Sequence, residues 1–456
     1  MKFKWMLKFT LSLLIVLLVA ACGQSESGNG SKSSESPSVS PTASEGTTDN
    51  KGADKPFDGR SINVTIANGA LGDAYRVLIP EYEKVSGVKV EFETLAETQI
   101  TQRLTVQFNS KSDNPDVFMY RANNEGPTYY INGWTEPLES YIAKSPEFDM
   151  NDFTEAGLYA VKYKGNMMGI PAATAQGVLY YRKDLLEAAN IPVPKTITEL
   201  IEAAKKLHDP KNEVYGFLGR GNEQALVSQI GTFLFTEGGD FLKDGKATIN
   251  TPEAVRAFSN YGMLLREYGP PGVQTMDWPQ TSALFAQGKA AFYVDGSPIH
   301  TNFNTKEKSE YWDKIGFSVI PAGAGGVARS YSSVNWSLGM NAYSKNKDVA
   351  WDFMNWIMSK ENVVKIQQLG VPGTRLSAWE NPESNKAFPP ELVPVVIETF
   401  KNGVGYQQPP VQNIAVARDA VGKVVSAAIE GKDVQKEADK QNAVFQALID
   451  EEQSKK

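Results

Sequence analysis

The chain has 456 residues, of which 22% are charged, and its formal net charge is −7 at pH 7. This acidic balance argues against binding to nucleic acid, or to an anionic membrane face, through basic patches. The single cysteine, Cys22, permits no disulfide within the chain, and two histidines far apart in sequence, His208 and His300, do not suggest a metal site. Stability must therefore come from packed cores, and roughly 400 residues beyond the N-terminal region are enough for two or three domains.

Residues 1–21 are typical of a secretory signal peptide. Three lysines precede a short apolar run at residues 11–21, and small residues stand directly before Cys22. A run of this length is too short to span a membrane comfortably as a helix. Loss of the signal peptide removes three positive charges and no negative ones, which changes the net charge from −7 to −10.

The residues around the predicted cleavage site, Val19-Ala-Ala-Cys22, resemble the lipobox of bacterial lipoproteins. This resemblance implies cleavage before Cys22, a diacylglycerol on its thiol and an acylated new N-terminus. We therefore expect a protein anchored to the cell membrane by its lipid alone, on the extracellular face. The alternative is an ordinary secreted protein whose cysteine happens to lie near the cleavage site.

Residues 22–56 are predicted to form a disordered linker between the lipid and a globular body. The segment is rich in Ser, Gly and Thr, and Val39 is its one sizeable apolar side chain. Such a composition cannot bury enough apolar surface to offset the entropy lost on ordering. A flexible coil of about 33 residues spans on the order of 30 Å, enough to hold a body off the bilayer.

From Phe57 onward the sequence alternates between strand and helix patterns. Strand, helix, strand, helix and strand are expected in turn at residues 62–66, 73–85, 88–92, 97–110 and 116–120. This order predicts a doubly wound α/β sheet. Ligands of such sheets bind beyond the carboxyl ends of the strands, where Asn68 and the residues from Tyr120 to Asn124 stand.

Later helices have clear boundary signals. Thr196-Ile-Thr-Glu199 is a capping box, and Thr251-Pro252 places a cap and a first-turn proline before a helix that ends near Glu267. Three further helices are expected at residues 347–358, 421–429 and 438–449. No internal repeat is evident.

Six blocks of sequence match a known family in order, at residues 115–138, 165–171, 179–186, 237–239, 285–296 and 338–350. The most specific is Leu179-Tyr-Tyr-Arg-Lys-Asp-Leu-Leu186. Together the blocks resemble family 1 of the extracellular solute-binding proteins, the maltose-binding-like group that serves ABC sugar importers. The resemblance extends over essentially all of residues 60–450.

The resemblance implies two doubly wound α/β lobes joined by a three-crossing hinge, the type II periplasmic-binding-protein-like fold. The crossings are expected near residues 172–177, 331–337 and 404–411. Lobe one would then hold residues 57–174 and 337–404, and lobe two residues 178–333 and 411–456. The ligand would lie in the cleft between the lobes, which close over it by a hinge motion.

The function that the resemblance implies is capture of a carbohydrate, either a monosaccharide or an oligosaccharide, and its delivery to the permease subunits of an ABC importer. We expect a monomer that performs no chemistry and needs no cofactor or metal. Two features depart from the maltodextrin-binding pattern. An acidic residue that the family places near Thr174 and Gln176 is absent, and Ile414 stands where the pattern has tryptophan. We therefore expect a ligand that is shorter than a maltodextrin or differently shaped.

A sugar offers apolar C–H faces to aromatic rings and hydroxyls to amides, carboxylates and guanidinium groups. On this basis and by resemblance the candidate ligand contacts are Asn68, Glu97, Tyr120, Asn123, Thr174, Gln176, Arg220, Asp295, Trp336 and Arg375. Tyr120 and Trp336 are expected to stack on the sugar. Arg220, between two glycines, is expected to offer a fork to vicinal hydroxyls or to a carboxylate.

Several candidates also have a purely structural interpretation. Asn68 suits a turn, Glu97 a helix cap, Tyr120 a place in the core and Arg220 a salt bridge. Two other functions also stay open: a cell-surface glycoside hydrolase, because its paired carboxylates can come from anywhere in a chain, and a carbohydrate-binding surface protein without a transport role. A phosphate-binding loop and a Gly-x-Ser-x-Gly nucleophile motif are both absent from the sequence.

Overall fold

The computed structural model describes residues 55, 57–324 and 326–454. The predicted signal peptide, Cys22 and, apart from Lys55, the predicted linker lie outside the described residues. Within the described part, no helix combines the length and the apolar character that crossing a membrane requires.

The described strands form one large sheet and two small hairpins. The sheet holds β1 (Ser61–Ala67), β2 (Lys89–Leu95), β3 (Val117–Tyr120), β6 (Ile170–Arg182), β7 (Tyr215–Leu218), β10 (Ala290–Gly296), β11 (Ile315–Ser318) and β12 (Ser332–Met340). The hairpins are β4 (Lys162–Tyr163) with β5 (Asn166–Met167), and β8 (Leu242–Lys243) with β9 (Lys246–Ala247).

The helices are more numerous and differ widely in length. In the described residues they are α1 (Ala70–Ser86), α2 (Glu97–Asn109), α3 (Gly126–Ile131), α4 (Glu139–Ile142), α5 (Glu155–Val161), α6 (Lys183–Ala188), α7 (Ile197–Leu207), α8 (Val227–Thr236), α9 (Pro252–Tyr268), α10 (Trp278–Ala286), α11 (Lys347–Ile357), α12 (Lys360–Gln368), α13 (Leu376–Glu380), α14 (Leu392–Asn402), α15 (Ile414–Ile429) and α16 (Val434–Ser454). Short 3₁₀ turns, among them η5 (Ser297–Asn302), lie between some of these elements.

The predicted α/β alternation is confirmed in the first part of the chain. β1, α1, β2, α2 and β3 coincide, within a few residues, with the segments expected from hydrophobic periodicity. β1 pairs in parallel with both β2 and β3, as expected for strands joined by helical crossovers. The capping box at Thr196 also forms as predicted, with the Thr196 hydroxyl accepting from the backbone N–H of Glu199 at 3.1 Å.

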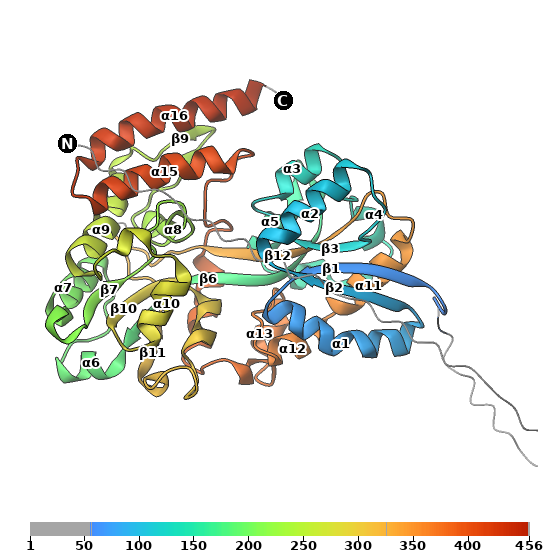
Figure 1. The fold of residues 1–456 in the computed structure, drawn as a ribbon, viewed down its shortest axis with the longest axis horizontal. Helices are drawn as coiled ribbons and strands as arrows, with labels where there is room; N and C mark the ends of the chain where they lie inside the picture. Colours follow the sequence, from blue (N-terminus) through green and yellow to red (C-terminus); the bar gives the residue numbers. More distant parts are fainter. Residues whose placement is uncertain (1–54, 56, 325, 455–456) are drawn as a thin grey trace, which may run out of the picture. The chain divides into compact units, whose positions relative to one another are not determined.

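Two long strands connect the halves of the large sheet (Figure 1). The strand order is β2-β1-β3-β12-β6-β10-β7, and β11 also pairs with β6. β12 lies antiparallel between β3 and β6, and β6 continues past it to pair with β10. Because β6 is 13 residues long, it reaches from one hydrophobic core into the next.

The buried apolar side chains form three cores. The first core holds residues between 62 and 173 and between 334 and 378, and the second holds residues between 175 and 331 and between 404 and 449. The third core joins β6 and β10 to α14. We call the residues around the first core the first lobe, and those around the second and third cores the second lobe.

The residues of the three cores can be compared with the lobe boundaries that were expected from the sequence. Core membership changes at residues 173–175, at 331–334 and again between Ala378 and Trp379. α14, placed in lobe one by the expected range 337–404, packs against β6 and β11 in the third core. The lobe boundaries and the third crossing at 404–411 stay a prediction.

Candidate ligand-binding cavity

A cavity of about 610 Å³ is bordered by residues of both lobes. The first lobe contributes Glu97, the first residue of α2, and Arg121, directly after β3. The second lobe contributes Arg220 after β7, Asp295 in β10 and Asp277, the N-cap residue of α10. Since Arg121, Arg220 and Asp295 stand at the carboxyl ends of their strands, the cavity occupies the side of the sheet where α/β folds bind ligands.

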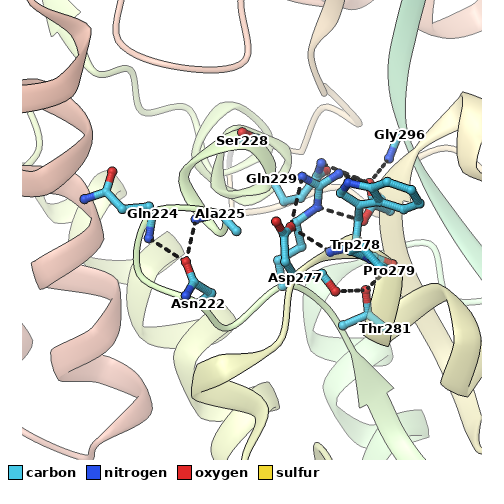
Figure 2. A network of polar contacts seen from close by, with 12 residues as sticks. Asn222, Gln224, Ala225, Ser228, Gln229, Asp277, Trp278, Pro279, Thr281 and Gly296 are labelled. Atoms are coloured by element: carbon cyan, nitrogen blue, oxygen red, sulfur yellow. Dashed lines mark hydrogen bonds and ion pairs between the residues drawn. The ribbon is translucent and has the colours of Figure 1, made fainter. Parts of the chain in front are cut away.

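The carboxylate of Asp295 is the centre of the polar contacts in the second lobe. Arg220 holds it with two parallel bonds, Nε to Oδ2 at 3.0 Å and Nη2 to Oδ1 at 2.7 Å. Gln229, Tyr293 and the backbone N–H of Gly296 donate three further bonds, at 3.1, 2.8 and 2.7 Å. Gln229 and Gly296 are labelled in Figure 2. Asp295 is fully buried, so these five donors replace the water that its carboxylate gives up on folding.

The loop that carries Arg220 needs the glycines on both sides. A side chain at Gly221 would overlap the carbonyl of Val273, and one at Gly219 would stand 2.7 Å from the Tyr261 hydroxyl. That hydroxyl donates to the carbonyl of Arg220 at 2.8 Å. Burial opposes the positive charge of Arg220, but Asp295 outweighs this effect and raises the pKa of the guanidinium. Arg220 therefore stays a cation, and its Nη1 lies 3.5 Å from Asp277 on the cavity wall.

A second arginine is held in a similar way in the first lobe. Arg121 donates from Nε to Glu125 at 2.9 Å and from its backbone N–H to the same carboxylate at 2.8 Å, and its Nη1 pairs with Glu97. Burial lowers the pKa of Arg121, but these two carboxylates more than offset it and the net shift is upward. Each lobe thus presents one arginine that is fixed between two carboxylates.

Aromatic rings supply the apolar part of the wall. Trp336 lies on β12 opposite Ala173 of β6, with a break in the pairing register on either side of it. Such irregularities re-aim a side chain, and Trp336 borders the cavity while half-buried against the first core. Trp278, the first residue of α10, is 42% exposed, and Tyr331 donates its hydroxyl to Gln229 at 2.9 Å.

Five of the ten candidate contacts line the cavity: Glu97, Asn123, Arg220, Asp295 and Trp336. Three others do not. Asn68 is exposed at the end of β1, while Thr174 and Gln176 are buried in β6 on either side of Ala175, which does border the cavity. Gln176 accepts a hydrogen bond from Ser297 at 2.8 Å, and its Nε2 has no partner among the described residues.

Tyr120 and Arg375 lie inside the protein instead. Tyr120 is 2% exposed, and its hydroxyl donates to the Met168 carbonyl at 3.0 Å. Arg375 is fully buried, pairs with Asp152 at 3.2 Å and stacks on Phe153. Neither residue borders the 610 Å³ cavity, but Tyr120 lines a separate cavity of about 360 Å³ together with Asn123, so the roles of Tyr120 and Arg375 as ligand contacts stay predictions.

Several residues of the wall were not candidates from the sequence. Trp278 follows an N-cap aspartate, and Arg418, followed by Asp419, is the first charged residue of α15. Gln408 donates to Asn124 of the first lobe and accepts from Arg418 of the second, so it links the two sides of the cavity. The signal available for Arg418 was that the first charged residue of α15 follows four apolar ones. Among the described residues, no group of three His, Cys, Asp or Glu side chains is arranged to hold a metal.

Comparison with known proteins gives a consistent result. Residues 68–364 match the sequence model of the family described as bacterial extracellular solute-binding protein. The mannitol-binding protein of Pseudomonas aeruginosa is 27% identical over 374 residues, which are 76% of this chain and 82% of that protein.

Solved structures match over a larger part of the chain. An ABC transporter solute-binding protein from Agrobacterium radiobacter K84, in complex with ribitol, is 28% identical with a TM-score of 0.74, covering 86% of this chain and 100% of that one. Maltose-bound MalE3 of T. maritima is 25% identical with a TM-score of 0.73, covering 85% and 99% of the two chains. The fold is therefore that of the maltose-binding-like proteins, as predicted.

Replacing Asp295 by alanine should lower the free energy of unfolding by about 3–5 kcal/mol, because it leaves the Arg220 charge buried without its main partner. Asp277→Asn is the matched control, since Asp277 is 44% exposed and its contact with Arg220 is 3.5 Å long. It should cost less than about 1 kcal/mol. Urea unfolding of both variants measures the difference, and equal losses would contradict the central place of Asp295.

Proposed function

This chain belongs to the family of bacterial extracellular solute-binding proteins, and we propose that it captures a small carbohydrate, a sugar or a polyol, in the 610 Å³ cavity. The observation that carries the proposal is the composition of the wall. Guanidinium, carboxylate and amide groups from both lobes surround one space, together with the rings of Trp278, Tyr331 and Trp336.

This combination suits a polyhydroxylated molecule. Hydroxyl groups require partners when they leave water, because an unpaired buried hydroxyl costs about 1–3 kcal/mol. The arginine and amide groups offer such partners, and aromatic rings cover C–H faces. Two similar proteins are described with mannitol and ribitol and a third with maltose, so the ligand class extends from polyols to oligosaccharides.

Transport is the role that we infer for the captured ligand. A ligand held by groups of both lobes favours the arrangement in which the lobes lie closest together. The permease subunits of an ABC importer can then recognise the loaded form and take up the ligand. We propose that the protein acts as a monomer and needs no cofactor.

Hydrolysis is less well supported by the wall. A glycoside hydrolase needs one carboxyl group that can donate a proton and one that can attack or activate water. Glu97, Asp277 and Asp295 each face an arginine, and both oxygens of Asp295 are occupied by protein donors. These contacts favour binding over chemistry.

Titration calorimetry with mannitol, ribitol and maltose tests the proposal. At least one of the three should give a saturable heat and be recovered unchanged by chromatography. Release of glucose from maltose would favour a hydrolase, and the absence of heat with a wider panel of sugars and polyols would refute the carbohydrate receptor.

Trp336→Ala should weaken binding of that ligand by about 1–3 kcal/mol, or roughly fivefold to 150-fold, by removing an aromatic surface from the wall. Trp312→Ala is the control, because Trp312 is 44% exposed and does not border the cavity. If the same titration gives an unchanged affinity for Trp336→Ala, Trp336 does not contact the ligand.

We also propose that Cys22 anchors the protein to the extracellular face of the cell membrane through its lipid. The proposal rests on the lipobox-like sequence before Cys22. Cys22→Ser should shift the protein from the membrane fraction to the medium or to an uncleaved precursor, and it should abolish labelling by radioactive palmitate. Labelling that persists in the variant would contradict the anchor.

A further inference from the structure

Three arginines border the cavity, and they differ in how their charges are balanced. Arg121 lies between Glu97 and Glu125, and Arg220 lies between Asp277 and Asp295. Arg418, on α15, forms no ion pair with any carboxylate of the described residues. Among the described residues it is therefore the guanidinium of the wall that has no carboxylate in an ion pair with it.

Uncharged oxygens hold Arg418 in place. Its Nη1 donates to the Ser228 hydroxyl at 3.1 Å and to the side-chain oxygen of Gln408, and its Nη2 donates to the carbonyl of Gln224. The backbone at Gln224 is itself fixed, since its N–H donates to Asn222 at 3.1 Å (Figure 2). A guanidinium has five N–H donors. Two of those of Arg418 therefore have no acceptor among the described residues.

The surroundings also disfavour the charge of Arg418. Burial, followed by the positive charges of Arg220 and Arg121, lowers its pKa to about 10, and the negative charge of Asp277 offsets only part of this shift. A guanidinium at this position is still charged at neutral pH, and within the described part of the chain no carboxylate forms an ion pair with it at the wall of the cavity. An anion from outside the chain would supply the missing counter-charge.

We propose that the carbohydrate bound by this protein carries a carboxylate, as in an aldonate or a uronate, and that the two free N–H groups of Arg418 bind it. This inference rests on the proposed function and specifies its ligand class. The hydroxyls of the ligand then meet the amides and the two paired arginines, while its carboxylate meets Arg418.

A carboxylate fits better than a phosphate. Its single charge matches one unpaired guanidinium, and its two oxygens match two N–H donors. A phosphate monoester carries nearly two charges at neutral pH and three acceptor oxygens. The lining residues offer no second cation for it, because Arg121 and Arg220 are each occupied by two carboxylates.

Matched pairs of ligands test the inference with the full-length chain in mild detergent. Mannitol is compared with mannonate, ribitol with ribonate and maltose with maltobionate, and mannitol 1-phosphate is the phosphate probe. Calorimetry is run on the wild type, on Arg418→Gln, which removes the charge, and on Arg418→Lys, which keeps the charge but not the fork. Lys423→Gln removes an exposed charge from the same helix as a control.

In at least one pair the affinity of the wild type for the acid should be roughly ten times its affinity for the neutral partner, or higher, because the acid forms a charge-assisted pair of bonds. Arg418→Gln should abolish that preference, so that the acid and its neutral partner bind this variant with similar affinities. Arg418→Lys should keep part of the preference, and Lys423→Gln all of it. Melting curves without ligand confirm that each variant is folded.

Four results would overturn the inference. If the neutral ligands bind at least as tightly as every acid, the ligand carries no carboxylate, although the proposed carbohydrate receptor is still supported. If both Arg418 variants still prefer the acid, Arg418 does not bind the carboxylate. If mannitol 1-phosphate binds more tightly than mannonate, the acidic group of the ligand is a phosphate and not a carboxylate. Failure of every probe would refute the proposed function, and the inference with it.

Discussion

Asp295 has no exposed surface, yet its side chain is a carboxylate at the end of a buried strand. Five donors from three separate segments of the chain satisfy it, and two of them belong to Arg220. The loop after β7, helix α8 and strand β10 therefore all donate hydrogen bonds to the same carboxylate. Because Arg220 and Gln229 also border the cavity, the shape of its wall in the second lobe depends on this one carboxylate. The cavity is in this sense organised around a buried ion pair.

The first part of the first lobe, from β1 to β3, could be predicted from local sequence. The strands and helices from Ser61 to Tyr120 are marked by hydrophobic periodicity, which depends only on residues close together in the chain. α15 shows where this fails. It begins at Ile414, seven residues before the predicted start, and the N–H groups of Gln412 and Asn413 donate to Glu452 of α16 at 3.1 and 2.7 Å. A helix end that is set by a distant side chain leaves no local signal. The packing of α14 in the third core depends on long-range contacts in the same way.

The site was predictable where a polar residue follows a strand. Arg220 and Asp295 were identified for that reason, although their mutual ion pair, 75 residues apart in sequence, was not. Tyr120 has the same sequence position relative to β3, but its ring turns into the first core and stacks on Tyr129. Which face of a strand end borders a cavity depends on the neighbouring strands and helices. Arg418 was missed because a cation in a helix is usually solvated. Its surroundings come from Gln224, Ser228 and Gln408, which only the folded chain brings together.

The most direct test of the whole account is a crystal structure of the protein with the ligand that binds it most tightly. The account predicts a carbohydrate inside the cavity, with hydroxyls within hydrogen-bonding distance of Arg220, a C–H face against Trp336, and the bonds between Arg220 and Asp295 intact. A ligand bound elsewhere, or an Arg220 that leaves Asp295 to reach the ligand, would contradict it.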